Sequence, residues 1–280
     1  EKAELRANPD KLNEMRIDAI ENFANWFSNA VIDENSEAMA QIEETCRANL
    51  ETQIKDPELR RKLTPDYRPA CKRLVFSEQF YTALQKPGTH LVDAGIEKIE
   101  TSGIRTKDGA LHELDVIVMC TGFHVDSFIR PTQVKGRNGM DLDEFWSEKP
   151  TAYLAMTMPD FPNMFMLNGP GGPVGNISLV TVSEEQMDYI LQLMDEVMEG
   201  RCREICVSHD AMTRFENERK EAAKKSIWAT GCNSWYLDPD GDPILWPYTW
   251  KQWVKEMREP DRADFVTATF AQEAVKERAA

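Results

Sequence analysis

The hydrophobic positions of the first 63 residues repeat with a helical period. Apolar residues recur at three- and four-residue steps among acids and amides, which predicts an amphipathic helix. A second helix is expected over 36–54, and Asp56-Pro57 begins a short third one, because proline is accepted in a first helical turn. Pro65 and Pro69 end this helical region. The positions that define the first apolar face are Ile17, Ile20, Phe23 (or Ala24), Phe27 and Val31.

From Arg73 onward the pattern predicts short strands. Asp108-Gly109 is typical of a tight hairpin turn. The run Val116–Met119 has apolar residues at every position, which predicts a strand buried on both faces. The other expected strands cover 74–76, 89–92, 96–99, 103–106 and 111–114.

The second half of the chain mixes strand and helix patterns. Met164–Leu167 predicts another buried strand, and a stretch rich in glycine and proline follows it at 169–176. A helix is expected from Ser183 to Gly200, and a charged helix over 210–226. The expected apolar face of the first of these helices comprises Met187, Ile190, Leu191, Met194 and Val197.

Composition and charge narrow the class of protein. The 280 residues could hold one large or two ordinary domains. With 33 basic and 48 acidic side chains the formal charge is −15, which disfavours nucleic acid and membrane surfaces as partners. No apolar run approaches the roughly 20 residues of a bilayer span, and no secretory signal is visible, so a cytoplasmic protein is expected. Six cysteines without a Cys-x-x-Cys pair are expected to be reduced thiols.

Two segments resemble metal sites only superficially. Cys202, Cys206 and His209 lack an evident fourth ligand. The acidic stretch 238–242 has glycine at its fourth rather than its sixth position, and Thr249 stands where a calcium loop needs a bidentate acid. No metal is therefore expected.

Three motifs carry a family resemblance. Residues 115–123 read Asp-Val-Ile-Val-Met-Cys-Thr-Gly-Phe and resemble the Ala-Thr-Gly-Phe junction of flavin monooxygenases with two dinucleotide-binding domains, with Cys120 in place of alanine. Cys71-Lys72-Arg73 and the run Tyr81–Leu84 resemble the segment that follows the helical insertion of Baeyer–Villiger monooxygenases. The tail segments 231–236 and 246–247 are similar to the hydroxyacetophenone monooxygenase branch, although they could equally be core and turn.

The resemblance implies an α/β fold that forms the C-terminal half of such a Rossmann-like flavoprotein. It implies a helical insertion at 1–64, the end of the NADP-binding domain at 65–123 and the end of the FAD-binding domain at 124–280. The chain has no Gly-x-Gly-x-x-Gly after a strand, the motif that holds a pyrophosphate at a helix N-terminus. An N-terminal FAD- and NADP-binding region is therefore expected to be required, either as a partner or as further sequence.

The resemblance also implies a reaction and two residue roles. NADPH would reduce FAD, oxygen would add at C4a of the flavin, and the peroxide anion beside Arg73 would attack a ketone to give an ester or lactone. A guanidinium suits this role because it stabilises an anion without giving up a proton. Lys72 would bind the 2′-phosphate of NADPH. Without the resemblance, an adjacent Lys-Arg pair could simply face solvent.

Two further segments are candidates for cofactor binding. In the family, the turn Thr121, Gly122, Phe123 runs close to the cofactors, although it could be an ordinary strand-to-loop turn. A loop rich in glycine before a helix can bring backbone N–H groups to the flavin, although it could also be a surface loop. The candidates in this loop are Gly169, Pro170, Pro173, Val174, Gly175 and Asn176.

Two other functions stay open at this point. A flavin monooxygenase that oxygenates nitrogen or sulfur shares the junction turn but does not need the Lys-Arg pair. A non-catalytic fragment or subunit that completes a partner's fold would explain the missing glycine motifs.

Overall fold

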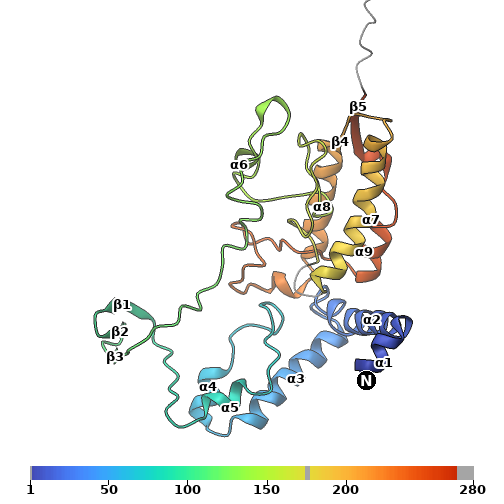
Figure 1. Ribbon diagram of the computed structural model, residues 1–280. Helices are drawn as coiled ribbons and strands as arrows, with labels where there is room; N and C mark the ends of the chain where they lie inside the picture. Colours follow the sequence, from blue (N-terminus) through green and yellow to red (C-terminus); the bar gives the residue numbers. More distant parts are fainter. Residues whose placement is uncertain (1, 174–176, 270–280) are drawn as a thin grey trace, which may run out of the picture. The chain divides into compact units, whose positions relative to one another are not determined.

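The computed structural model describes residues 2–173 and 177–269, which divide between two compact units. The first unit comprises the described residues of Glu1–Ile42, Tyr67–Arg73 and Asp126–Ala280. The second unit comprises Glu43–Asp66 and Leu74–Val125. Each unit contains both helix and strand (Figure 1).

The first unit begins with two helices, α1 (Lys2–Ala7) and α2 (Pro9–Phe23). The side chain of Asn8 caps α2 by accepting a hydrogen bond from the N–H of Lys11. A short π-helix (Ala24–Ser28) continues α2 and changes its register. The helical prediction for this region is confirmed. However, α2 itself buries no residue, and the predicted apolar face is buried beyond it, at Ala24, Phe27 and Val31.

Three helices and a two-stranded sheet build the main core of the first unit. These are α7 (Leu179–Met198), α8 (His209–Ala223), α9 (Trp250–Glu256), β4 (Glu204–Val207) and β5 (Phe265–Ala268). The two strands are antiparallel, and the three helices lie alongside one another below them (Figure 1). The largest side chains of this core include Tyr189, Leu193, Ile205, Trp246 and Trp253.

The structure corrects the predicted position and face of α7. The helix begins at Leu179, four residues before the predicted Ser183, and Gly200 follows its end in the left-handed conformation. Of the predicted apolar face, Met187, Leu191 and Met194 are 40–47% exposed. Ile190 is buried as predicted, but the prediction is wrong for these three residues because a polar residue, Gln186, takes a core position. The buried face comprises Thr181, Val182, Gln186, Tyr189, Ile190 and Leu193.

A second apolar cluster lies under the loops between residues 126 and 166. It includes residues of α6 (Leu142–Phe145). The unit also has three short 3-10 turns, which are η2 (Arg137–Gly139), η3 (Ile227–Thr230) and η4 (Arg262–Asp264). The predicted strand at 164–167 is wrong: this segment makes one ladder-like hydrogen bond, from the N–H of Met166 to the carbonyl of Met156 at 2.8 Å. The buried members of the cluster are Leu142, Trp146, Ala152, Met158, Phe161 and Met166.

The second unit holds a small sheet and three helical segments. Helix α3 (Glu37–Gln53) runs from the first unit into the second and is followed by α4 (Pro57–Leu63) and α5 (Phe80–Leu84). Strands β1 (Ile96–Glu100), β2 (Gly103–Thr106) and β3 (Leu111–Glu113) form an antiparallel meander, with a tight turn at Asp108-Gly109. These elements confirm the predicted helices and the predicted hairpin.

The remaining strand predictions in this unit are wrong. Residues 74–76, 89–92 and 116–119 have no strand conformation. The run Val116–Met119 was expected to be buried on both faces, yet its four side chains are 74%, 38%, 78% and 67% exposed. Among the described residues no strand pairs with this run.

Candidate functional site

The Lys-Arg pair follows a tight turn in the first unit. The N–H of Cys71 donates to the carbonyl of Arg68 at 3.3 Å, and Ala70 inside the turn has a positive φ of 66°. The guanidinium of Arg68 binds Glu34 through a carboxylate oxygen at 3.1 Å and the backbone carbonyl at 2.7 Å. This anchored turn fixes the backbone from which Lys72 and Arg73 extend.

A disulfide joins this turn to the C-terminal part of the chain. Cys71 bonds Cys232, with their Cα atoms 6.2 Å apart. The expectation of reduced thiols is therefore wrong for these two residues, because the fold brings together cysteines that are 161 positions apart in sequence. The free cysteines among the described residues are Cys46, Cys120, Cys202 and Cys206.

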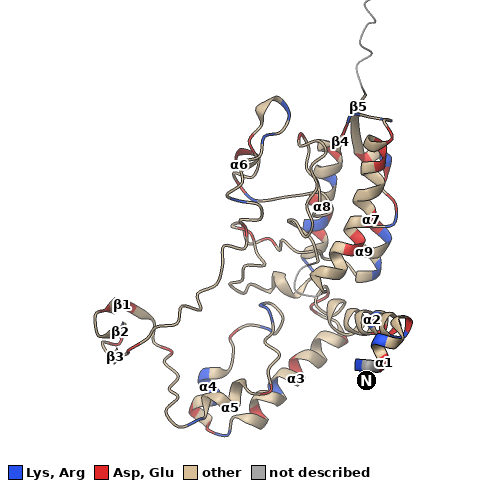
Figure 2. Ribbon diagram, viewed as in Figure 1, with Lys and Arg blue, Asp and Glu red and all other residues tan. Residues whose placement is uncertain are grey.

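The two cations of the pair have no carboxylate partner among the described residues. The ammonium of Lys72 lies 4.2 Å from the centroid of the Tyr67 ring, a cation–π contact. The side chain of Arg73 is exposed. Acidic and basic segments are interspersed along the helices of the first unit (Figure 2), so two adjacent cations without a counter-ion stand out in a chain of charge −15. Such a pair fits an anionic ligand.

A buried tyrosine lies near Arg73. Burial raises the pKa of the Tyr236 hydroxyl, and the positive charge of Arg73 opposes that rise, so the two side chains are within electrostatic reach. The rings of Trp228 and Trp235 pack on Tyr236 with centroid distances of 6.2 and 4.3 Å. Sequence reasoning singled out this tail segment by its resemblance but did not name Tyr236 as a site residue; its place beside Arg73 depends on the tertiary fold.

The start of the glycine-rich loop is fixed by α7. The side chain of the fully buried Gln186 accepts a hydrogen bond from the N–H of Asn168 at 2.8 Å and donates to the carbonyls of Leu154 and Ala155 at 3.2 and 3.3 Å. The N–H of Gly169 also donates to Ala155, at 2.9 Å. This network holds the loop against the segment at 154–155.

The loop is closely packed where it begins. A Cβ atom on Gly169 would lie 2.6 Å from the carbonyl oxygen of Ala155, and one on Gly172 would lie 3.2 Å from the Ala155 side chain. Pro170 and Pro173 are buried. The N–H groups of Gly171 and Gly172 have no partner among the described residues, which fits an electron-rich group such as a flavin edge. Val174, Gly175 and Asn176 lie outside the described residues.

The junction turn belongs to the second unit, whereas the other candidates belong to the first. Thr121, Gly122 and Phe123 are all exposed, and the ring of Phe123 is 95% exposed. Gly122 has a φ of +94°, and a Cβ there would meet nothing within 4 Å. Glycine is therefore needed at this position for backbone conformation and not for space.

Several of the residues that resemble metal ligands have other partners. The carboxylate of Asp238 pairs with Lys149 at 2.6 Å and accepts from the N–H groups of Asp240 and Asp242. His209 bonds Asp160 at 2.8 Å, and burial raises the pKa of the Cys202 and Cys206 thiols. Within 2–173 and 177–269 no cluster of His, Cys, Asp and Glu could hold a metal ion.

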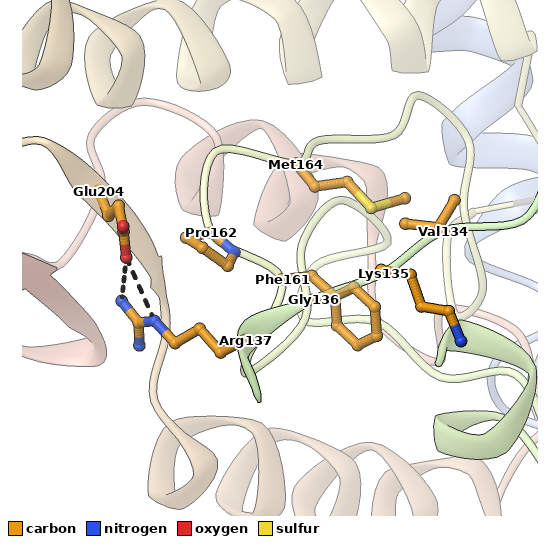
Figure 3. A pocket seen from close by; sticks show the side chains of 8 residues that line it. All are labelled: Val134, Lys135, Gly136, Arg137, Phe161, Pro162, Met164 and Glu204. Atoms are coloured by element: carbon orange, nitrogen blue, oxygen red, sulfur yellow. Dashed lines mark hydrogen bonds and ion pairs between the residues drawn. The ribbon is translucent and has the colours of Figure 1, made fainter. Parts of the chain in front are cut away.

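A pocket of about 280 Å³ opens beside the second apolar cluster (Figure 3). Arg137 and Glu204 face each other across its edge at 3.2 Å, and Lys135 pairs with Asp141 at 2.6 Å, so its charges are already neutralised. None of the candidates from the sequence lines it. The lining residues are Val134, Lys135, Gly136, Arg137, Phe161, Pro162, Met164 and Glu204.

Curated relatives align with most of the chain. An uncharacterized monooxygenase of Mycobacterium tuberculosis is 45% identical over 203 residues, which are 72% of this chain and 41% of that protein. A Baeyer–Villiger monooxygenase of Streptomyces coelicolor is 36% identical over 227 residues, 80% of this chain and 44% of that protein. The chain matches a C-terminal portion of Baeyer–Villiger monooxygenases. It spans less than half the length of these relatives, and no family model matches it.

Solved monooxygenase structures share the fold. Cyclohexanone monooxygenase from Rhodococcus sp. Phi1 bound to NADP⁺ is 26% identical with a TM-score of 0.74, covering 85% of this chain and 46% of that one. A steroid monooxygenase bound to NADP has a TM-score of 0.73 at 25% identity, covering 84% of this chain and 46% of that one. These matches confirm the predicted α/β class and the family resemblance. None of the helices in the part of the chain that the structure describes is long and apolar enough to cross a membrane.

Proposed function

We propose that the protein to which this chain belongs is an FAD-containing, NADPH- and O2-dependent Baeyer–Villiger monooxygenase that inserts oxygen next to a ketone carbonyl. The observation that carries the proposal is the exposed guanidinium of Arg73, which has no counter-ion among the described residues and extends from a turn that a disulfide and the Arg68 contacts anchor. The relatives named Baeyer–Villiger monooxygenase support the reaction class.

The residues of this chain would hold the cofactors at several points. Lys72 would bind the 2′-phosphate of NADPH, with the Tyr67 ring limiting the rotamers of its ammonium. The N–H groups of the loop at 169–176 and the turn at 121–123 would contact FAD. When bound, FAD reduced by NADPH would supply the activated oxygen; the chemistry of oxygen activation belongs to the cofactor.

Arg73 would act by electrostatics alone. Its guanidinium stays protonated at any physiological pH, so it can face a negatively charged oxygen without transferring a proton. The same charge would stabilise the negative charge that develops on the substrate carbonyl oxygen, and an interaction that strengthens toward the transition state raises the rate. The buried Tyr236 beside it would limit the positions that the guanidinium can take.

An N-terminal region would complete the cofactor sites. The chain spans 41–46% of its relatives, and the apolar run Val116–Met119 lies exposed without strand partners in the described residues. Both facts support such a region. Within this chain we keep the proposed parts as a helical insertion at 1–64 and the ends of the NADP- and FAD-binding domains at 65–123 and 124–280. The protein would work in the cytoplasm on a small-molecule ketone.

The experiment that tests the proposed function compares three substrate classes. The full-length protein is incubated with NADPH, ¹⁸O-labelled O2 and a ketone, a sulfide or an amine, and the products are analysed by mass spectrometry. Ester or lactone that contains one ¹⁸O atom supports the proposal. Sulfoxide or N-oxide formation with unreacted ketone would instead show a flavin monooxygenase that oxygenates heteroatoms.

A further inference from the structure

We infer that the Cys71–Cys232 disulfide is a redox-dependent tether that keeps Lys72 and Arg73 in the position they need for the reaction. The inference names a regulation of the proposed site, and its role in catalysis rests on the proposed function. The tether itself is defined by the structure alone and can be tested without any enzymatic assay.

The bond connects the segment that carries Arg73 with the segment that carries Tyr236, whose side chains are within electrostatic reach of each other. On one side, Cys71 directly precedes Lys72 and Arg73. On the other side, Cys232 follows Gly231, which has a φ of 91°, and precedes Tyr236 by four residues. One covalent bond therefore fixes the distance between the backbone of Arg73 and the buried tyrosine beside it.

Few other contacts hold the end of this segment. Arg68 anchors the start of the turn to Glu34, but Arg73 is five residues further along and only two residues from Cys71. The hydroxyl of Thr230 approaches the sulfur of Cys71 at 3.6 Å and also bonds the carbonyl of Ile227. Directly after Arg73 the chain leaves the first unit. Without the disulfide, Lys72 and Arg73 would follow the motion of that connection.

The chemistry of the tether is a two-electron exchange. In forming the bond, the thiols of Cys71 and Cys232 lose two protons and two electrons to a disulfide oxidant, which becomes two thiols; a dithiol reductant reverses the step and is itself oxidised to a disulfide. Glutathione and thioredoxin keep most cytosolic thiols reduced, so in the expected compartment the bond would form under oxidising conditions and these reductants would reverse it. Both cysteines are buried, with exposed fractions of 0% and 6%. A reductant or oxidant can therefore reach the sulfurs only when this part of the chain moves apart.

The test measures how fast trypsin cuts the full-length protein after Lys72 and Arg73. Cleavage after Lys224 and Lys225, in the same unit, serves as the internal reference. Four samples are compared: wild type purified without reductant, wild type treated with dithiothreitol, Cys232→Ser, and Cys46→Ser as a control that removes a free cysteine. Peptide mapping without reduction should join peptide 63–72 to peptide 226–251 in the untreated wild type and in Cys46→Ser.

We expect cleavage at the Lys-Arg pair to be at least tenfold faster in Cys232→Ser and in the reduced wild type, with the reference unchanged and Cys46→Ser like wild type. The KM for NADPH should rise in the same two samples. Unlinked peptides in the air-purified protein, or equal cleavage rates with and without the bond, would overturn the tether. If Cys232→Ser does not fold, the cleavage rate of the reduced wild type alone tests the tether. If the wild type oxidises no ketone, the proposed function is refuted. The trypsin result would still show whether the disulfide holds Lys72 and Arg73 in place.

Discussion

At the scale of single residues, the account depends on two cations that the rest of the chain leaves unneutralised. The ammonium of Lys72 lies over the Tyr67 ring, and neither Lys72 nor Arg73 has an acidic partner among the described residues, although acids outnumber basic residues by 48 to 33. Charged side chains without a partner cost little at a surface, so their presence alone proves no function. The anchored turn before them fixes the backbone from which both side chains extend, so they can be held in place for a ligand.

The first prediction concerns Lys72. Replacing Lys72 by Ala should raise the KM for NADPH about tenfold and leave the KM for NADH almost unchanged, because only NADPH carries the 2′-phosphate and a charge-assisted hydrogen bond is worth about 1.5–3 kcal/mol. Steady-state kinetics of the full-length protein measures both constants. Lys135→Ala, which removes a lysine paired with Asp141, is the matched control and should change neither. An equal rise for both cofactors would remove the phosphate-binding role.

The second prediction concerns the pH dependence of stability at Asp238. Burial alone would raise the pKa of this carboxyl, but the hydrogen bond from Lys149 and the nearby backbone N–H groups outweigh it and hold the pKa below the ordinary 3.8. The folded state therefore favours the ionised form. Its contribution to stability is complete above the ordinary pKa and is lost as the pH falls through the depressed value.

Urea unfolding at pH 6 and at pH 3 measures this effect. Asp238→Asn should cost about 2 kcal/mol at pH 6, since a hydrogen bond to a charged group is lost, and it should narrow the stability difference between the two pH values. Asp240→Asn is the control, because the Asp240 carboxylate lies 3.8 Å from Lys149 and is largely exposed. If Asp238→Asn leaves the pH dependence of the unfolding free energy unchanged, the pKa of this carboxyl does not differ between the folded and unfolded states.

Several site residues could be predicted from sequence only because of motif resemblance. Lys72, Arg73 and the turn at 121–123 were found that way, and their roles stay predictions. The disulfide and the position of Tyr236 could not be found, because Cys71 and Cys232 are 161 residues apart and no local pattern links them. The cysteine spacing instead led to the expectation of reduced thiols, which is wrong for these two residues.

At the scale of elements, α7 positions the glycine-rich loop through one polar side chain. Gln186 lies fully buried on the core face of α7 and makes three hydrogen bonds to backbone groups at Leu154, Ala155 and Asn168. Buried backbone groups are costly when left without partners. The loop conformation therefore depends on a residue that hydropathy alone would place at the surface.

The third prediction is that Gln186→Leu destabilises the fold by about 3 kcal/mol, because a buried donor and carbonyls lose their partner while the volume is nearly conserved. Urea unfolding of the full-length protein measures the loss. Gln192→Leu, on the exposed side of the same helix, should cost less than about 1 kcal/mol although Gln192 also donates to two carbonyls, those of Asp188 and Arg258. Equal losses in both variants would mean that the buried network does not hold the loop.

Local patterns predicted those elements that are stabilised by contacts within themselves. The helices at 37–53 and 57–63 and the hairpin around Asp108-Gly109 depend on caps, period and turn chemistry, and all are present. The isolated strand predictions failed because a strand needs partners that local sequence does not specify. The buried face of α7 was predicted wrongly because apolar residues, Met187, Leu191 and Met194, lie on its exposed side while the polar Gln186 is buried.

At the scale of the whole molecule, the chain spans less than half of its relatives, and some of its apolar surface has no cover in the described residues. The run Val116–Met119 has the composition of a buried strand, and α7 exposes Met187, Leu191 and Met194. Apolar patches of this kind mark surfaces that contact another part of a protein. The N-terminal region of the full-length protein is the cover that the proposal requires.

The fourth prediction follows from this incompleteness. The 280 residues alone should purify without stoichiometric flavin, and the backbone amides of 116–119 should exchange within seconds. The full-length protein should show the visible absorbance of bound FAD and slow exchange at the same amides. Absorbance spectra and hydrogen-exchange mass spectrometry measure both. Stoichiometric flavin in the 280 residues alone would mean that they contain a complete cofactor site.

The most direct test of the central claim measures NADPH consumption and ester formation together in full-length wild type and Arg73→Ala. We expect wild type to couple the two. Arg73→Ala should still oxidise NADPH but form at least 100-fold less ester, because removing one preorganised charge stabiliser typically costs about 10²–10³ in rate. Arg68→Lys, which alters the anchor of the turn but keeps a cation, should retain most of the ester formation. Undiminished ester formation by Arg73→Ala would contradict the account.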